Sequence, residues 1–194
     1  ITINTNTTSK LSKEEIINQA IQFHLKGNIK EASKLYQYFI NQGFKDHRIF
    51  SNFGAILQGL GKLEEAQKWF RKAIELNPDF AKAHSNLGTL LKDLGKLQDA
   101  ELSTRKAIEL NPDFAKAHSN LGTILRDLGK LQDAELSTRK AIELNPDLIS
   151  AHLKLGDILF ELDKPEEASI SEWKAIKLNP LFKYLEYYRK NAKL

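Results

Sequence analysis

The sequence of 194 residues contains no cysteine, and this absence excludes several kinds of site at once. Disulfides, thiolate metal sites and cysteine nucleophiles all need that residue. The chain also lacks any apolar run near the roughly 18 residues that cross a membrane, and no signal peptide is visible. We therefore expect a cytoplasmic protein without membrane association.

Charge of one sign is not concentrated in the central part of the sequence, although the formal net charge is +4. Acidic and basic residues balance within residues 79–112 and again within residues 113–146. A protein that binds a nucleic-acid backbone needs a continuous basic stripe, which this distribution lacks. Nucleic-acid binding is therefore not expected.

What the sequence does contain is one stretch that occurs twice. Residues 79–112 and residues 113–146 differ only at Leu90/Ile124 and Lys92/Arg126. A unit copied this faithfully can serve the same structural role twice, but it cannot be a unique active site.

The step from one copy to the next is a period that extends over most of the chain. Periods of about 20–50 residues mark repeat architectures, because each unit can bury its apolar face only against a neighbour. One row of prolines, two rows of glycines and one row of alanines keep this step: Pro78, Pro112, Pro146 and Pro180; Gly54, Gly88, Gly122 and Gly156; Gly27, Gly61, Gly95 and Gly129; Ala32, Ala66, Ala100, Ala134 and Ala168.

Each unit divides into two helices. Residues 80–94 carry apolar side chains at helical spacing, and residues 97–110 do so again. Gly95 supplies a left-handed residue that ends the first helix, and Pro112 stops the second. Asp113 then stands where the N-cap of the next helix is expected.

We predict an all-α fold of five helix-turn-helix units in one continuous array, between a flexible leader and a C-terminal capping helix. The leader covers residues 1–12, and a capping box of Ser12 and Glu15 begins the first helix. For residues 181–194 the alternative to a capping helix is the first half of a sixth repeat. The five units span residues 13–46, 47–80, 81–114, 115–148 and 149–180.

This pattern resembles the tetratricopeptide repeat family, in which a large residue, Leu-Gly, a large residue, alanine, an aromatic residue, alanine and proline follow one another. The resemblance covers about residues 13–180. It implies a right-handed α-solenoid whose first helices line a concave groove. The unit at 47–80 carries the pattern as Phe50, Phe53-Gly54, Leu57, Ala66, Phe70, Ala73 and Pro78.

Some positions depart from the family pattern. Thr104 and Thr138 stand where the family prefers an aromatic residue, so we expect thinner packing between the two helices there. The unit at 149–180 replaces the turn glycine with Asp163. It also has Pro165 in the first turn of its second helix, where proline is tolerated.

No catalytic constellation is visible. Phosphate-binding loops, nucleophile elbows and metal-binding helix motifs are all missing. His84, His118 and His152 recur in register, but equivalent positions of neighbouring repeats lie on the order of 10 Å apart, too far to share one metal ion. We interpret these histidines as packing or groove-lining residues, and we predict no catalytic residues, no metal and no cofactor.

A polar ladder is the more informative pattern. Asn52, Asn86 and Asn120 occupy one position of the first helix in three consecutive units, and the ladder ends at Lys154. An asparagine side chain can donate to and accept from a peptide backbone. The ladder resembles that in the repeat domain of O-linked N-acetylglucosamine transferases, which implies binding of an extended chain. Alternatively, these asparagines only satisfy neighbouring backbone groups.

The same face of the first helices should present further polar and basic residues, and their balance favours a ligand with some acidic character. These residues are Arg48, Lys82, Ser85, Thr89, Lys92, Lys116, Ser119, Thr123 and Arg126.

Leu102, Leu136 and Ile170 form a periodic apolar row on the second helices. We favour partly buried packing for this row, because it would compensate for the small side chains of Thr104 and Thr138. An exposed stripe would instead suggest self-association.

The leading hypothesis is a non-enzymatic scaffold, monomeric or weakly self-associating, that binds an extended peptide or protein segment in its groove. A second hypothesis is the substrate-recruiting repeat module of a larger enzyme, such as a glycosyltransferase or hydroxylase, whose catalytic domain lies outside these residues. A third is a self-assembling structural array.

Overall fold

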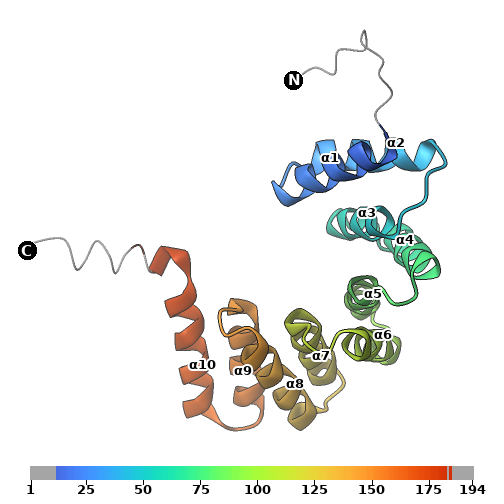
Figure 1. The fold of residues 1–194 in the computed structure, drawn as a ribbon. Coiled ribbons are helices and arrows are strands. Elements are labelled where there is room, and N and C mark those ends of the chain that lie inside the picture. The colour runs from blue at the N-terminus through green and yellow to red at the C-terminus, as the bar shows by residue number, and fades with distance from the viewer. Residues whose placement is uncertain (1–11, 183, 185–194) are drawn as a thin grey trace, which may run out of the picture. The chain divides into compact units, whose positions relative to one another are not determined.

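The computed structural model describes residues 12–182 and 184 (Figure 1). Residues 12–179 contain ten helices that follow one another as five helical hairpins, and the described residues contain no strand. The predicted all-α fold of successive helix-turn-helix units is thereby confirmed. The helices are α1 (Lys13–Leu25), α2 (Ile29–Asn41), α3 (His47–Gly59), α4 (Leu63–Leu76), α5 (Ala81–Asp93), α6 (Leu97–Leu110), α7 (Ala115–Asp127), α8 (Leu131–Leu144), α9 (Ile149–Glu161) and α10 (Pro165–Leu178).

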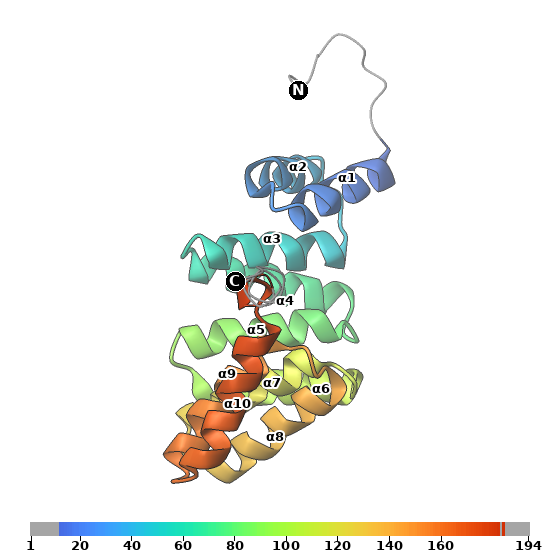
Figure 2. The ribbon, with the colours of Figure 1, turned by 90° about the vertical axis from the view of Figure 1, so that its left-hand side faces the viewer.

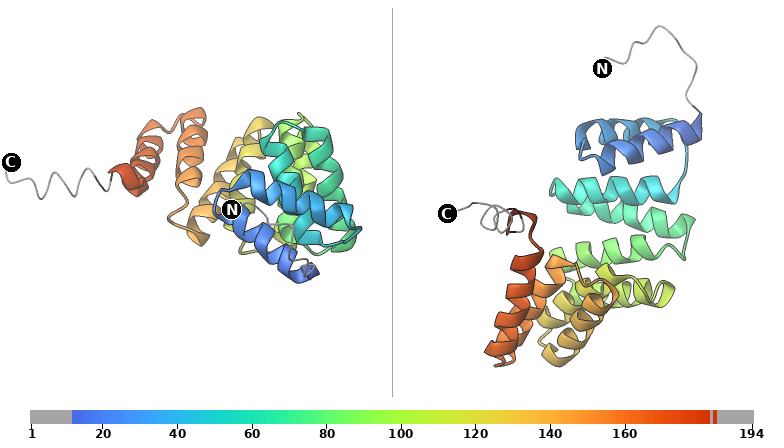
Figure 3. Two further views of the ribbon diagram at one scale, coloured as in Figure 1. Left: turned by 90° about the horizontal axis from the view of Figure 1, so that it is seen from above. Right: turned by 60° about the vertical axis from the view of Figure 1, so that its left-hand side comes forward.

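The helices group into two compact units, which meet in the sequence between Phe80 and Ala81. The first unit holds α1–α4 and the second holds α5–α10. In both views of Figure 3 the two helices of a hairpin lie side by side, as their direct contacts require. Continuity of the array from one unit to the other stays a prediction.

The turns between paired helices follow from single residues with positive φ. Gly27, Gly61, Gly95 and Gly129 have φ values between 72° and 75°, and Asp163 takes the same place with φ 59°. Aspartate tolerates this left-handed conformation better than most residues with a side chain. The fifth unit therefore keeps the turn without glycine.

Two predictions about helix beginnings have different outcomes. Ser12 and Glu15 do form the capping box, with the Ser12 amide donating to Glu15 Oε2 at 2.7 Å. Asp113 is not an N-cap, because α7 is preceded by Phe114 at that position. The Asp113 amide instead donates to Asn111 Oδ1 at 3.2 Å, so the side chain of Asn111 holds the turn.

The expected thin packing at the threonines is wrong. Thr104 is fully buried, and its hydroxyl donates to the Ala100 carbonyl at 2.8 Å. A methyl group added at Gly88 would collide with Thr104 Oγ1 and lie 3.1 Å from the Ala100 carbonyl oxygen. The threonine therefore packs directly onto the glycine of the facing helix, and Thr138 packs onto Gly122 in the same way.

The apolar row on the second helices, in contrast, is exposed. Leu102 and Leu136 are each 68% exposed, and Ile170 is 58% exposed. The preferred interpretation of partly buried packing is therefore wrong. In α6 the residues buried against the facing first helix are Ala100, Thr104 and Ala107, and Leu102 projects away from that helix.

Only the first residues of the predicted C-terminal helix are described. Residues 180–182 and 184 are helical, and the ring of Phe182 meets Trp173 edge-on at 5.6 Å between centroids. Residues 183 and 185–194, and residues 1–11 of the predicted leader, lie outside the described residues. Within the described part of the chain, no helix has the length and apolar character needed to span a bilayer.

Candidate functional site

The first helices of the second unit form one side of its helix stack. α5 contacts α7 and α7 contacts α9, whereas α6 and α8 share no such contact within the described chain. The first helices α5, α7 and α9, labelled in Figure 2, therefore approach one another more closely than the second helices α6 and α8 do. We call this side the first-helix face. It carries Lys82, Thr89, Asn120 and their equivalents in the neighbouring repeats.

The ladder residue Asn120 joins two repeats. Its amide nitrogen donates to Thr89 Oγ1 at 3.0 Å and lies 3.4 Å from Ser85 Oγ, both on the preceding first helix. Thr89 in turn donates to the Ser85 carbonyl at 3.1 Å. The donor side of the Asn120 amide is thus used within the protein, and its Oδ1 is the atom left for a ligand.

Lys154 occupies the same ladder position one repeat later and makes the matching contact. Its Nζ donates to Ser119 Oγ at 3.2 Å and lies 3.4 Å from the Ser119 carbonyl oxygen. Sequence reasoning treated Lys154 as the end of the ladder and missed this role. Its spacing of one full repeat from Asn120 is the signal that could have found it.

Two predicted groove residues are covered by these contacts. Ser85 is 2% exposed and Ser119 is 1% exposed, because the ladder residue of the following repeat lies over each of them. Neither serine can therefore contact a ligand directly without displacing Asn120 or Lys154. Their role in this structure is to position the ladder.

A small hollow of about 160 Å³ opens on the first-helix face. It brings together predicted groove residues from α5 and α7 with the lysine from α9. The lining residues are Thr89, Lys92, Asn120, Thr123, Ile124 and Lys154.

Lys82, Lys92, Lys116 and Lys154 bring positive charge to this face, which Asp93 and Asp127 partly offset. Burial lowers the pKa of Lys154, and the charges of Lys92 and Lys116 lower it further against the opposing effect of Asp127. Burial and the charge of Lys116 likewise lower the pKa of Lys82. The charge of Lys116 thus acts on both Lys82 and Lys154, and Asp127 partly offsets it at Lys154.

Arg126, predicted to face a ligand, instead pairs with acidic residues of the next repeat. Its guanidinium bonds Asp157 Oδ2 and Glu161 Oε1 of α9, each at 3.1 Å. The charge of Arg126 is therefore already neutralised by the next repeat. Lys92, which holds the equivalent position on α5, pairs with Asp93 at 3.1 Å.

The predicted site residues of the first unit, Arg48 and Asn52, also have partners within that unit. Arg48 bonds both oxygens of Asp46, and it approaches Glu14 at 3.4 Å. Burial raises the pKa of Tyr36 to about 12, and a hydrogen bond with Asn52 acts against that rise. The candidate site therefore rests on the second unit alone.

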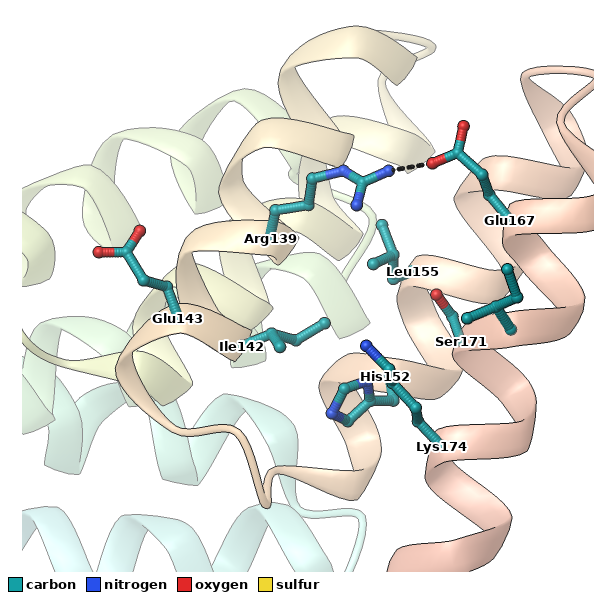
Figure 4. A pocket seen from close by; sticks show the side chains of 9 residues that line it. Arg139, Ile142, Glu143, His152, Leu155, Glu167, Ser171 and Lys174 are labelled. Atoms are coloured by element: carbon teal, nitrogen blue, oxygen red, sulfur yellow. Dashed lines mark hydrogen bonds and ion pairs between the residues drawn. The ribbon is translucent and has the colours of Figure 1, made fainter.

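A second hollow of about 370 Å³ lies among α8, α9 and α10 (Figure 4). Arg139 and Glu167 close part of its rim with an ion pair at 2.6 Å. His152, in its wall, is buried and bonds the Pro146 carbonyl at 2.8 Å, as His118 bonds Pro112 at 2.9 Å. Both histidines thus hold the turn before their own helix. No cluster in the described residues has the three or more ligands that would hold a metal ion.

Comparison with known proteins places this geometry among repeat proteins. Models of the TPR repeat and the tetratricopeptide repeat match residues 54–95, 81–114 and 115–148. No curated protein matches the chain by sequence.

Solved structures with the same fold share little sequence. A thermophilic TPR protein of Thermus thermophilus is 19% identical, with TM-score 0.75, over 92% of this chain and 98% of that one. MamA of Desulfovibrio magneticus RS-1 is 22% identical, with TM-score 0.69, over 86% and 94%. YrrB, a TPR protein with an unusual peptide-binding site, is 21% identical, with TM-score 0.63, over 92% of each chain.

Proposed function

We propose a protein-binding function for this chain, starting from the fact that it contains tetratricopeptide repeats. Such repeats are typically non-catalytic interaction modules. The finer proposal is that the first-helix face of α5, α7 and α9 binds an extended, acidic segment of a partner protein.

The observation that carries the proposal is the small hollow lined by Lys92, Asn120 and Lys154, to which Lys82 and Lys116 add positive charge nearby. The charge of Lys116 lowers the pKa of both Lys82 and Lys154, and the charge of Lys92 also lowers that of Lys154. A carboxylate placed among these lysines relieves their mutual repulsion and accepts hydrogen bonds from them. Asn120 Oδ1 then remains to accept from a peptide N–H.

The duplicated sequence supports an extended ligand. Lys82 and Lys116 stand at the same position in two successive repeats, as do Thr89 and Thr123. A ligand that crosses both repeats meets the same groups twice, which suits a repetitive acidic segment or one recognised through its backbone. YrrB is described as having a peptide-binding site, and this chain shares its fold.

Binding of a fluorescently labelled oligo-glutamate peptide tests the proposal, with oligo-glutamine of the same length as the uncharged comparison. Lys92→Ala and Lys116→Ala should each weaken binding about tenfold, which corresponds to ~1.4 kcal/mol. Affinity should also fall as the pH rises through the lowered pKa values of Lys82 and Lys154, because the lysines then lose their charge.

Lys106→Ala and Lys140→Ala provide the matched control, because these lysines lie on second helices and are 43% exposed. They should leave the affinity nearly unchanged. Equal losses for both pairs of variants would reduce the effect to net charge and exclude a site on the first-helix face.

A further inference from the structure

A third hollow, of about 360 Å³, lies in the first unit and is lined by α2, α3, α4 and the turn between α2 and α3. Its size is within the range of about 300–1,000 Å³ in which ligand sites fall. It corresponds to the hollow of Figure 4, three periods earlier in the sequence, because four lining positions are equivalent. The equivalent residues are Ile40 and Ile142, Phe50 and His152, Trp69 and Ser171, and Lys72 and Lys174. We call the hollow of the first unit the aromatic hollow.

The lining of the aromatic hollow departs from the later repeats in one direction. In those repeats the turn before the first helix reads Asn-Pro-Asp, at residues 77–79, 111–113 and 145–147. In the first unit Phe44 replaces the proline and Lys45 replaces the aspartate. Phe50 and Trp69 likewise replace a histidine and a serine that the three later repeats share. Four exchanges therefore bring rings or positive charge to one hollow, two from the turn and one each from α3 and α4.

The rings at this hollow rest on the core of the first unit. Trp69 packs against Phe50 with 5.0 Å between ring centroids, and Phe44 packs against Phe39 of α2 at 5.3 Å. Phe50 is 7% exposed and Phe39 is fully buried. The hollow thus has a packed aromatic wall, and such a wall favours a further ring that can meet it edge-on or offset.

Lys72 is placed differently from the equivalent lysines of the next two repeats. Each of those lysines bonds the glutamate three residues later, as Lys106–Glu109 at 2.7 Å and Lys140–Glu143 at 2.6 Å. The Nζ of Lys72 lies instead over the Trp69 ring, 4.4 Å from its centroid, although Glu75 stands three residues later. Among the described residues, neither Lys45 nor Lys72 forms an ion pair. Two ammonium groups therefore stand beside one carboxylate, that of Glu75, at the aromatic hollow.

We propose that the aromatic hollow binds an aromatic side chain of a partner protein that is followed by an acidic residue. The ring enters beside Phe44, Phe50 and Trp69, and the carboxylate accepts hydrogen bonds from Lys45 and Lys72. The aspartate that later repeats carry at the position of Lys45 would repel such a ligand. The site uses residues of the first unit alone, so it does not depend on the proposed function of the first-helix face in the second unit.

Trp69 lines the aromatic hollow and can report its occupancy. Trp173→Phe leaves Trp69 as the single tryptophan of the full chain. Its emission is titrated with the peptide Gly-Phe-Asp-Gly, capped at both ends, and should change until the site is saturated. The peptide Gly-Ala-Asp-Gly should bind at least about tenfold more weakly, because it buries no ring. Gly-Phe-Asn-Gly should bind about threefold more weakly, because it lacks the charge.

Substitutions at the rim test the charges. Lys45→Asp restores the residue of the later repeats and should weaken binding about tenfold, because repulsion replaces attraction. Lys45 is exposed, so the circular dichroism spectrum of this variant should match that of the parent chain. Lys68→Ala is the matched control, since Lys68 is exposed on α4 one turn before Lys72 and does not belong to the lining. It should leave the affinity unchanged.

Three outcomes of the titration would overturn the proposal. One is a Trp69 emission that does not respond to the peptide. Another is equal affinity for the peptides with and without the ring, and the third is an equal loss in Lys45→Asp and Lys68→Ala. A response of Trp173 with the same affinity in a Trp69→Phe chain would place the peptide in the second unit and overturn it as well.

Other occupants of the hollow have their own tests. Excess oligo-glutamate should not displace the peptide, and displacement would mean that the peptide binds to the first-helix face. Chains that lack residues 1–11 or residues 185–194 should bind the peptide with the affinity of the full chain. A gain in affinity for either shortened chain would assign the hollow to that segment instead of a partner protein.

Discussion

Aromatic rings pack within and between the repeats of the first unit. In the second unit, ion pairs and side-chain hydrogen bonds join one repeat to the next. Tyr36 of α2 meets Phe53 of α3 edge-on, with 6.4 Å between ring centroids. Within the next hairpin, Trp69 packs against Phe50 at 5.0 Å and Phe53 at 5.6 Å. These contacts carry no net charge and should respond little to pH or salt.

The second unit uses alanine, leucine and threonine in its hairpins and polar contacts between them. Lys130 bonds Glu101 at 2.7 Å, and Lys164 makes the same bond to Glu135. The same helix-turn-helix pattern therefore accommodates either aromatic packing or polar contacts between repeats, provided that a small residue lies where the two helices of a hairpin approach each other.

The largest expected effect comes from converting the first unit to the chemistry of the second. Phe70 is fully buried and its ring lies over Gly54, where the second unit has threonine over glycine. Phe70→Thr leaves a cavity and should lower the free energy of unfolding by about 3 kcal/mol. Urea unfolding followed by Trp69 fluorescence in a Trp173→Phe background would report on this unit.

Tyr38→Thr is the control for that prediction, because Tyr38 lies on α2 and is 45% exposed. Its loss should cost less than about 1 kcal/mol. A similar cost for both substitutions would mean that the buried ring contributes no more than an exposed one.

A smaller effect is expected where the second unit packs threonine onto glycine. Gly88→Ala forces a methyl group against Thr104 Oγ1 and should cost about 1–3 kcal/mol, measured as thermal unfolding by circular dichroism. Thr104→Ala in the same chain should recover part of this loss.

Gly59 has no atom within 4 Å of an added methyl group, so Gly59→Ala should stabilise the protein by up to about 1 kcal/mol. Stabilisation by Gly88→Ala as well would refute the close contact.

The sequence predicted the helices well because their signals are local. Apolar spacing and the periodic glycines locate each helix and each turn, including the turn at Asp163, which has positive φ without glycine. The prediction of Asp113 as N-cap was wrong because α7 begins only at Ala115, and its N-cap residue, Phe114, makes no side-chain hydrogen bond to the helix.

The site was harder to predict because it depends on contacts between repeats. Periodicity places Asn120 and Arg126 on one helix but does not show that the neighbouring repeats supply their partners, Thr89 and Asp157. The exposure of Leu102 was missed for a related reason. A helical period does not say how far apart two second helices stand, and the backbones of α6 and α8 do not approach each other closely within the described chain.

The smallest expected effect concerns the ion pairs that distinguish the second unit. Burial raises the pKa of Glu135, but hydrogen bonds from Lys164 and Arg139 outweigh it and hold the pKa below its ordinary value of 4.5. The charged form therefore stabilises the folded state above pH 4.5, and this contribution is lost as the pH falls through the lowered pKa. Glu135→Gln should cost about 1 kcal/mol at neutral pH and almost nothing below that pKa.

Glu143→Gln is the matched control, because Glu143 pairs with Lys140 on the same helix and its side chain is 67% exposed. It should change stability little at any pH. The two tryptophans allow the comparison between units in one protein, since Trp69 reports on the first and Trp173 on the second. Glu135→Gln should reduce the shift that acidification causes in the unfolding seen by Trp173. It should leave the shift seen by Trp69 unchanged, because the acid-sensitive pair of the first unit is that of Asp46 with Arg48. An equal effect at both tryptophans would mean that Glu135 does not act within the second unit.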